Sequence, residues 1–194
     1  WFPTTSTWPV GLTVIEKVSV GPSQLIPLLV YVGVTTIVDV WDSDVLLLIA
    51  GKAWENDFTN YQRIIDENNL SDYCLLHTKF IPHDEVEHYY CAADLVVLPY
   101  KKIYQSGVLV MTLSYGKPAL VSNLPPLKEI VTDMQTAFLF ESENSISLAE
   151  KLNLILLDPE KLEQVRINGE ELINTKYDWN EIGRQTKQAC QPLY

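Results

Sequence analysis

Hydrophobic residues along the chain form short apolar runs, and segments with helical spacing separate these runs. Val45–Ala50, Cys74–His77 and Leu95–Leu98 are such runs, and each stops at a glycine, a proline or a polar residue. Runs of this length and composition predict strands that are buried on both faces. Phe58–Asn68 and the segment that begins at Pro82 instead carry apolar residues three or four positions apart, which predicts helices.

The same alternation continues to the end of the chain. It predicts a helix over 106–115, a strand over 118–122, a short helix over 126–131, a strand over 137–140, helices over 146–157 and 159–173, and a last helix that begins near residue 178. Gly116 is a normal helix-ending glycine, and the short side chain of Asp178 suits an N-cap. Strands and helices in this order indicate parallel βαβ units, so the predicted fold class is α/β, a Rossmann-like parallel sheet with flanking helices.

The first 44 residues follow a different pattern. Prolines interrupt the region repeatedly, and it predicts one or two strands, of which Leu28–Val34 is the clearest. Too little chain separates Leu28–Val34 from Val45–Ala50 for a full parallel crossover, which takes a dozen or more residues. We therefore predict an irregular segment over 1–44 and a Rossmann-like domain over 45–194.

Composition narrows the class of protein. With 47% hydrophobic and 20% charged residues the chain is globular rather than disordered. Its net charge of −11 argues against a nucleic-acid binder, and against an anionic membrane surface except through a local patch. The most apolar stretch, Leu25–Val38, is interrupted by Pro27 and is shorter than the roughly 20 residues of a spanning helix, so we expect no transmembrane span.

Cysteine and histidine spacing gives no metal motif. The three cysteines are far apart, and the histidines form no ligand pattern. Asp42-Ser43-Asp44 spells DxD but precedes a strand, where it marks a turn rather than a metal site. We expect no metal and a reduced, cytoplasmic protein.

Ligands of open parallel sheets bind beyond the carboxyl ends of the strands. The residues that follow the predicted strands are 51–54, 79–81, 100–107 and 122–124. Among them, Ser106-Gly107 begins a helix, where free N–H groups and the helix dipole favour an anion. An N-cap serine followed by a permissive glycine explains the pair equally well.

Two further features suit an anionic ligand that carries a base. Lys52, Lys101 and Lys102 could neutralise phosphate, and no acidic residue adjoins Lys101 or Lys102 in the sequence, although each lysine could equally be a solvated surface residue. Phe80-Ile81 could flank a flat ring or pack in the core.

Three stretches together resemble the C-terminal domain of family 4 (group 1) glycosyltransferases, namely LLLIAG (46–51), FIPHDEVEHYYCAADLVVLPY (80–100) and QSGVLVMTLSYGKPALVSNLPPLKEIV (105–131). The resemblance extends over about 45–184 and includes the YDW segment at 177–179. It implies half of a GT-B fold, in which two Rossmann-like domains face each other and the C-terminal one holds a nucleotide-sugar donor.

The resemblance also assigns residues. Gln105, Ser106, Gly107 and Val108 fall where the family offers backbone N–H groups to the donor diphosphate, and Phe80 and Ile81 fall where the nucleobase is lodged. Glu129 matches a helix position of the scaffold.

Three departures from the family pattern affect these expectations. Ile103 and Met111 occupy the positions of two glutamates, the second of which binds the donor ribose in the family. The Arg and Lys that neutralise the leaving diphosphate are absent before Lys52, so Lys52, Lys101 and Lys102 are the candidates for partial replacement. Residues 1–44 are also too few for an acceptor-binding N-terminal domain.

The leading hypothesis is therefore the donor-binding domain of a retaining glycosyltransferase, which moves a hexosyl group from a nucleoside-diphosphate sugar to a hydroxyl acceptor. The donor is a substrate, and no cofactor is implied. We expect the chain alone to be inactive, because its acceptor domain is missing, and we expect a cytoplasmic location, with peripheral attachment of the full-length enzyme to the inner membrane left open. The alternatives are a non-catalytic GT-B-like interaction module and an unrelated nucleotide-binding α/β domain.

Overall fold

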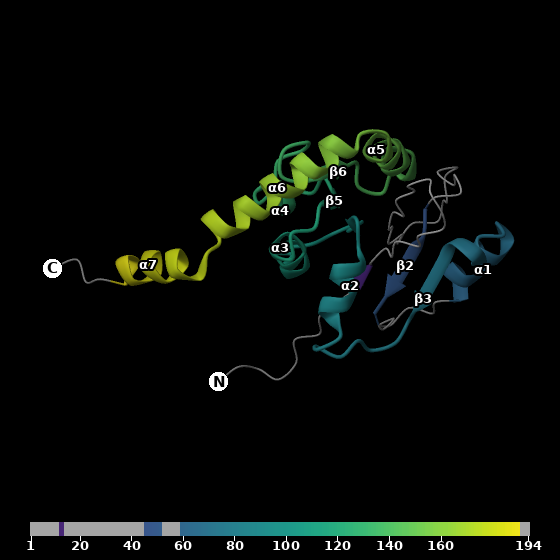
Figure 1. Ribbon diagram of the computed structural model, residues 1–194, viewed down its shortest axis with the longest axis horizontal. Coiled ribbons are helices and arrows are strands. Elements are labelled where there is room, and N and C mark those ends of the chain that lie inside the picture. The colour runs from purple at the N-terminus through teal and green to yellow at the C-terminus, as the bar shows by residue number, and fades with distance from the viewer. Residues whose placement is uncertain (1–11, 14–44, 52–58, 191–194) are drawn as a thin grey trace. The chain divides into compact units, whose positions relative to one another are not determined.

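The computed structural model describes residues 12–13, 45–51 and 59–190. The chain consists of two compact units, Trp1–Pro99 and Tyr100–Tyr194, whose helices and strands are labelled in Figure 1. The predicted strand Leu28–Val34 lies outside the described residues. The boundary predicted between residues 44 and 45 falls at the edge of a described segment and stays a prediction.

The first unit contains a small sheet. Strands β2 (Leu47–Ala50) and β3 (Cys74–His77) lie parallel, and β1 (Leu12–Thr13) pairs with β2 in the antiparallel direction. Every residue of β2 is buried, as expected for an apolar strand without an exposed face. Both parallel strands lie within the runs that the sequence predicts.

The other elements of the first unit also follow the hydrophobic pattern. They are helix α1 (Thr59–Glu67), the 3₁₀ turn Ser71–Tyr73, helix α2 (Val86–Ala92) and strand β4 (Val96–Leu98). All three residues of β4 are buried. On α2, Tyr90 is fully buried.

The second unit contains helices α3 (Gly107–Ser114), α4 (Pro125–Lys128), α5 (Ser145–Leu157), α6 (Pro159–Lys176) and α7 (Trp179–Ala189), and strands β5 (Ala119–Ser122) and β6 (Phe138–Phe140). Strands β5 and β6 are parallel, with Ser122 opposite Phe140, so both strands end at the same edge. Parallel strands flanked by helices confirm the predicted α/β class.

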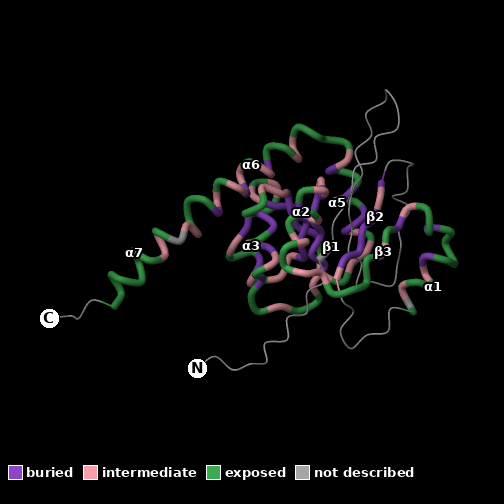
Figure 2. Tube along the Cα trace, turned by 60° about the horizontal axis from the view of Figure 1, so that its bottom comes forward, coloured by how far each residue is buried: buried purple, intermediate pink, exposed green. Residues whose placement is uncertain are grey.

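The core of the second unit forms where helices pack on these strands. Helix α5 buries Leu148, Ala149, Leu152 and Ile155, which share one face at helical spacing. Helix α6 approaches α3 closely at Gly169, where an added Cβ would lie 2.9 Å from Leu113 Cδ2. Figure 2 colours buried residues purple and exposed ones green, and α7 is exposed over most of its length.

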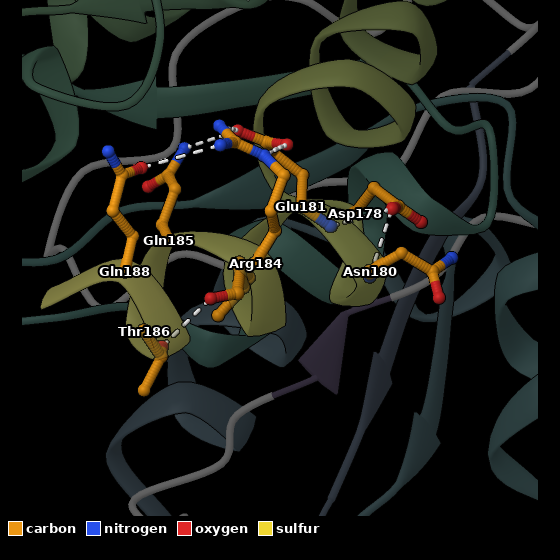
Figure 3. A network of polar contacts seen from close by, with 8 residues as sticks. Asp178, Asn180, Glu181, Arg184, Gln185, Thr186 and Gln188 are labelled. Carbon is orange, nitrogen blue, oxygen red and sulfur yellow. Dashed lines mark hydrogen bonds and ion pairs between the residues drawn. The ribbon is translucent and has the colours of Figure 1, made fainter. Parts of the chain in front are cut away.

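Local polar contacts hold α7 together. Asp178 is its N-cap, as predicted, and accepts hydrogen bonds from the backbone N–H groups of Asn180 and Glu181 at 2.9 and 3.1 Å. Arg184 forms two hydrogen bonds with the Glu181 carboxylate, of 2.6 and 2.7 Å, and Gln185 donates a third (Figure 3). These hydrogen bonds lower the pKa of Glu181 to about 2, and hydrogen bonding with Arg184 is the largest cause.

The helices of the described residues include none that combines the length and apolar character needed to cross a membrane.

Candidate functional site

The N-terminus of α3 has the geometry that an anion site needs. Ser106 is extended (φ −125°, ψ 95°), and its Oγ accepts a hydrogen bond from the Leu109 N–H at 3.0 Å. Ser106 is therefore an N-cap, and it is only 4% exposed. The cap satisfies the third N–H of the helix and leaves the first two, which belong to Gly107 and Val108, without a hydrogen bond among the described residues.

Those two N–H groups lie at the positive end of the helix dipole. Gly107 is exposed and has no side chain that could shield its backbone from a ligand. Behind them, Leu109, Thr112 and Leu113 are buried and fix the helix in the unit. The cap interpretation is thus confirmed, and the two free N–H groups are compatible with the anion interpretation as well.

Three loops meet beside this helix terminus. Ser142, which follows β6, donates a hydrogen bond from its Oγ to the Tyr100 carbonyl at 3.0 Å, and its N–H donates to Asn123 Oδ1 at 3.3 Å. Asn123 follows β5, and its N–H donates to the Phe140 carbonyl at 2.8 Å. Ser142 therefore connects the segment before α3 to the carboxyl ends of both strands, which is the edge where parallel sheets bind ligands.

Tyr100 connects the same segment to the cap. Its hydroxyl lies 3.5 Å from Ser106 Oγ, a long contact in which the serine donates. Burial raises the pKa of the Tyr100 phenol, and the hydrogen bond with Ser106 offsets part of that rise. Tyr100 is therefore a neutral phenol at physiological pH, and it adds no charge to the site.

The two lysines of this segment have different neighbours. Lys101 Nζ lies 3.5 Å from Glu143 Oε2, with both side chains about 60% exposed. Lys102 Nζ lies 5.6 Å from the ring centroid of Tyr104, whose side chain points largely into solvent at 80% exposure. No acid adjoins Lys101 in the sequence, but the fold brings Glu143, in the loop after β6, next to it.

The remaining predicted site residues are placed as follows. Gln105 is exposed and Val108 half-buried, next to the cap. Phe80 is 72% exposed and Ile81 half-buried in the first unit, so Phe80 does not pack in the core. Lys52 lies outside the described residues. Whether Lys52, Phe80 and Ile81 contact the same ligand as α3 stays a prediction.

The departures from the family pattern are visible in the structure. Met111 is 37% exposed on α3 and Ile103 is half-buried, so neither position offers a carboxylate. Glu129 is exposed just after α4. Among the described residues no three His, Cys, Asp or Glu side chains gather as a metal site would require.

Sequence reasoning missed Ser142 and Glu143. Their partners, Tyr100 and Lys101, are 42 residues away along the chain, so no local pattern could reveal the contacts. A signal was nevertheless present, because both residues follow the predicted strand 137–140 and satisfy the rule that selected the other loops.

The sequence matches the model of a known protein family. The sequence model of the family described as "Glycosyl transferases group 1" matches residues 33–172, more than half of the chain. No match was found among curated proteins.

Several solved structures share the fold. Sucrose-phosphate synthase from Thermosynechococcus elongatus is 24% identical, with a TM-score of 0.64 over 75% of this chain and 37% of that one. HepE from Anabaena, solved in complex with UDP, is 19% identical, with a TM-score of 0.69 over 76% of this chain and 41% of that one. The C-terminal domain of LpcC, a group 1 family protein from Francisella tularensis, is 20% identical, with a TM-score of 0.64 over 70% of this chain and 71% of that one. The chain thus spans less than half the length of the first two proteins.

Proposed function

The chain belongs to the glycosyl transferases group 1 family, and on that premise we propose that its second unit binds the diphosphate of a nucleoside-diphosphate sugar at the N-terminus of α3. The observation that carries the proposal is the pair of N–H groups at Gly107 and Val108, which make no hydrogen bond to any residue that the structure describes; two exposed lysines, Lys101 and Lys102, precede them in the chain. HepE, which shares the fold, has been solved with UDP and with UDP-glucose, which supports a donor of this class.

In the complete enzyme the transferred group is a hexosyl unit, and its anomeric configuration is retained. The bond between the anomeric carbon and the β-phosphate oxygen breaks, the diphosphate leaves with the electron pair, and an acceptor hydroxyl oxygen bonds to the anomeric carbon from the face that the diphosphate leaves, so the configuration is retained. Backbone N–H groups stabilise the negative charge that grows on the leaving group, because they are already oriented before the reaction. We expect the base that takes the hydroxyl proton to belong to the acceptor-binding domain, and we therefore expect no turnover by this chain alone.

Two observations favour the alternative of a non-catalytic interaction module. Glu143 forms an ion pair with Lys101, and Met111 stands where the resemblance leads us to expect a ribose-binding carboxylate. Both reduce the affinity that a donor would gain. Calorimetric titration of the chain with UDP, GDP, UDP-glucose and GDP-mannose separates the two functions, because a module without a donor site would bind none of the four.

A matched pair of variants then tests the location. Gly107→Pro removes the first N–H of α3, and proline is well accepted at this helix position, since Ser106 before it is already extended. Gly107→Ala also adds a side chain but keeps the N–H. A hydrogen bond to a charged group contributes about 1.5–3 kcal/mol, so Gly107→Pro should bind the nucleoside diphosphate at least tenfold more weakly than Gly107→Ala. Equal affinity of the two variants would refute this location.

A further inference from the structure

The loop after β6 contacts the segment before α3 at two adjacent residues with opposite chemistry. Ser142 donates a hydrogen bond to the Tyr100 carbonyl at 3.0 Å, and Glu143 pairs with Lys101 at 3.5 Å. We propose that these two residues control donor binding in opposite directions: Ser142 positions the segment that carries the lysines, and Glu143 competes with the donor diphosphate for Lys101. The proposal rests on the function proposed above and names two residues that regulate that same site.

Ser142 acts through backbone contacts. Its Oγ and its N–H connect Tyr100 to Asn123, so the start of the 100–106 segment is fixed to both strand ends. The end of that segment is fixed by the Ser106 cap. Without the Ser142 hydroxyl, Lys101 and Lys102 would sample more positions, and ordering them on a ligand would cost more conformational entropy.

Glu143 acts through charge. Its carboxylate and the Lys101 ammonium are both about 60% exposed, so the pair is reachable by a second anion. A phosphate gains less binding free energy from an ammonium that is already paired with a carboxylate. The phosphate must either displace the carboxylate or bind close to its negative charge.

The backbone indicates that Glu143 is held in this place. Its φ is +59°, in the left-handed region that residues other than glycine, asparagine and aspartate seldom adopt. The preceding residue, Ser142, is fixed by two hydrogen bonds. The backbone of the turn therefore orients the Glu143 side chain towards Lys101.

The test is calorimetric titration of the full chain with UDP and with GDP, at about 50 and 300 mM salt, for the unmodified chain and four single variants. Ser142→Ala should weaken binding by roughly 2- to 10-fold, the range for loss of one hydrogen bond, and Ser142→Thr, which keeps a hydroxyl, should restore most of it. Glu143→Gln should tighten binding by about 2- to 5-fold at low salt, with a smaller gain at high salt.

The fourth variant, Glu141→Gln, is the matched control. Glu141 lies in the same loop and carries the same charge, but its carboxylate accepts from Asn144 Nδ2 at 2.6 Å instead of pairing with a lysine. It should leave the affinity unchanged, because the proposed effect depends on contact with Lys101 and not on the charge of the loop. In a Lys101→Met background the effect of Glu143→Gln should disappear.

Outcomes that overturn the proposal are distinct from failure of the proposed function. If UDP or GDP binds the unmodified chain but Glu143→Gln does not raise the affinity, the proposed competition is refuted. It is also refuted if Glu143→Gln still raises the affinity in the Lys101→Met background. If Ser142→Ala binds normally, or Ser142→Thr is as weak as Ser142→Ala, the positioning role is refuted. If neither probe binds the unmodified chain, the proposed function itself is wrong, and this inference is overturned with it.

Discussion

Gly169 provides the sharpest test of the packing that supports the candidate site. It is buried on α6, where the helix meets α3. Glycine inside a helix is normally about 1 kcal/mol worse than alanine, so propensity alone predicts that Gly169→Ala stabilises the protein. The structure predicts the opposite.

The reason is the space around the missing Cβ. An alanine Cβ at this position would lie 2.8 Å from the Thr136 carbonyl oxygen and 2.9 Å from Leu113 Cδ2. A carbon and a carbonyl oxygen come no closer than about 3.3 Å even in favourable C–H···O contacts, and Thr136 contributes backbone that cannot rotate away. Overpacking costs about 1–3 kcal/mol, and two contacts under 3.0 Å, one of them to backbone, place this site in the upper part of that range, at about 2–3 kcal/mol. Subtracting the helix-propensity gain of about 1 kcal/mol leaves a net loss of roughly 1–2 kcal/mol.

The assay is thermal and urea unfolding followed by circular dichroism. For a chain of this size, a loss of 1–2 kcal/mol lowers Tm by roughly 2–8 °C. Gly183→Ala is the control, because Gly183 lies on α7 with nothing within 4 Å of its added Cβ. That substitution should stabilise α7 by about 0.5–1 kcal/mol, measured as slower amide exchange in this helix. If Gly169→Ala unfolds at or above the temperature of the unmodified chain, the close approach of α6 to α3 is wrong.

Three further predictions concern single side chains. Ser106→Ala removes the cap of α3 and should cost about 1 kcal/mol, whereas Ser106→Thr, which keeps the accepting oxygen, should retain most of the stability on urea unfolding. Glu181 has a pKa lowered to about 2, so its stabilisation of α7 is complete above the ordinary carboxyl pKa of 4.5 and is lost as the pH falls from 4.5 through 2. The helicity of α7, followed by NMR, should fall in that pH window, and it should not fall there in Glu181→Gln. Burial raises the pKa of Cys74 to about 11, while Cys91 and Cys190 are exposed, so a thiol reagent at pH 8 should label two cysteines in the native chain and a third only after unfolding.

Local features of the structure were predictable from the sequence. The apolar run Cys74–His77 is a strand with the predicted bounds, and Ser106 and Asp178 cap the predicted helices. These features depend on residues within one turn or one strand, where spacing and side-chain chemistry decide the conformation.

Contacts between distant segments were not predictable in the same way. Lys101 appeared to be free of acids because none adjoins it in the sequence, yet the fold places Glu143 at 3.5 Å. Gly169 lies within the predicted helix 159–173, and only the approach of Thr136 and Leu113 explains why a side chain would not fit there. Such contacts depend on how elements pack, which hydrophobic periodicity does not specify.

The two ends of α3 differ in their charged neighbours, and this difference bears on how an acidic chain could bind the proposed anion. At the C-terminal end, Gly116 (φ +62°) closes the helix, and Arg166 Nη1 lies 3.5 Å from its carbonyl oxygen. Arg166 also holds Glu163 and Glu170, so two of the acids on α6 are paired with a cation that complements the negative end of the dipole.

The N-terminal end of α3 is the positive end of the helix dipole. Within the described part of the chain, the N–H groups of Gly107 and Val108 make no hydrogen bond, Lys101 and Lys102 precede the helix, and Glu143 pairs with Lys101. At physiological salt, the interaction between exposed charges is screened beyond about 8 Å. The charges near α3, rather than the net charge of −11, therefore set the electrostatic potential at the proposed site. The net charge therefore does not oppose the proposed diphosphate binding at α3, and the ion pair between Lys101 and Glu143 is the contact that we propose limits it.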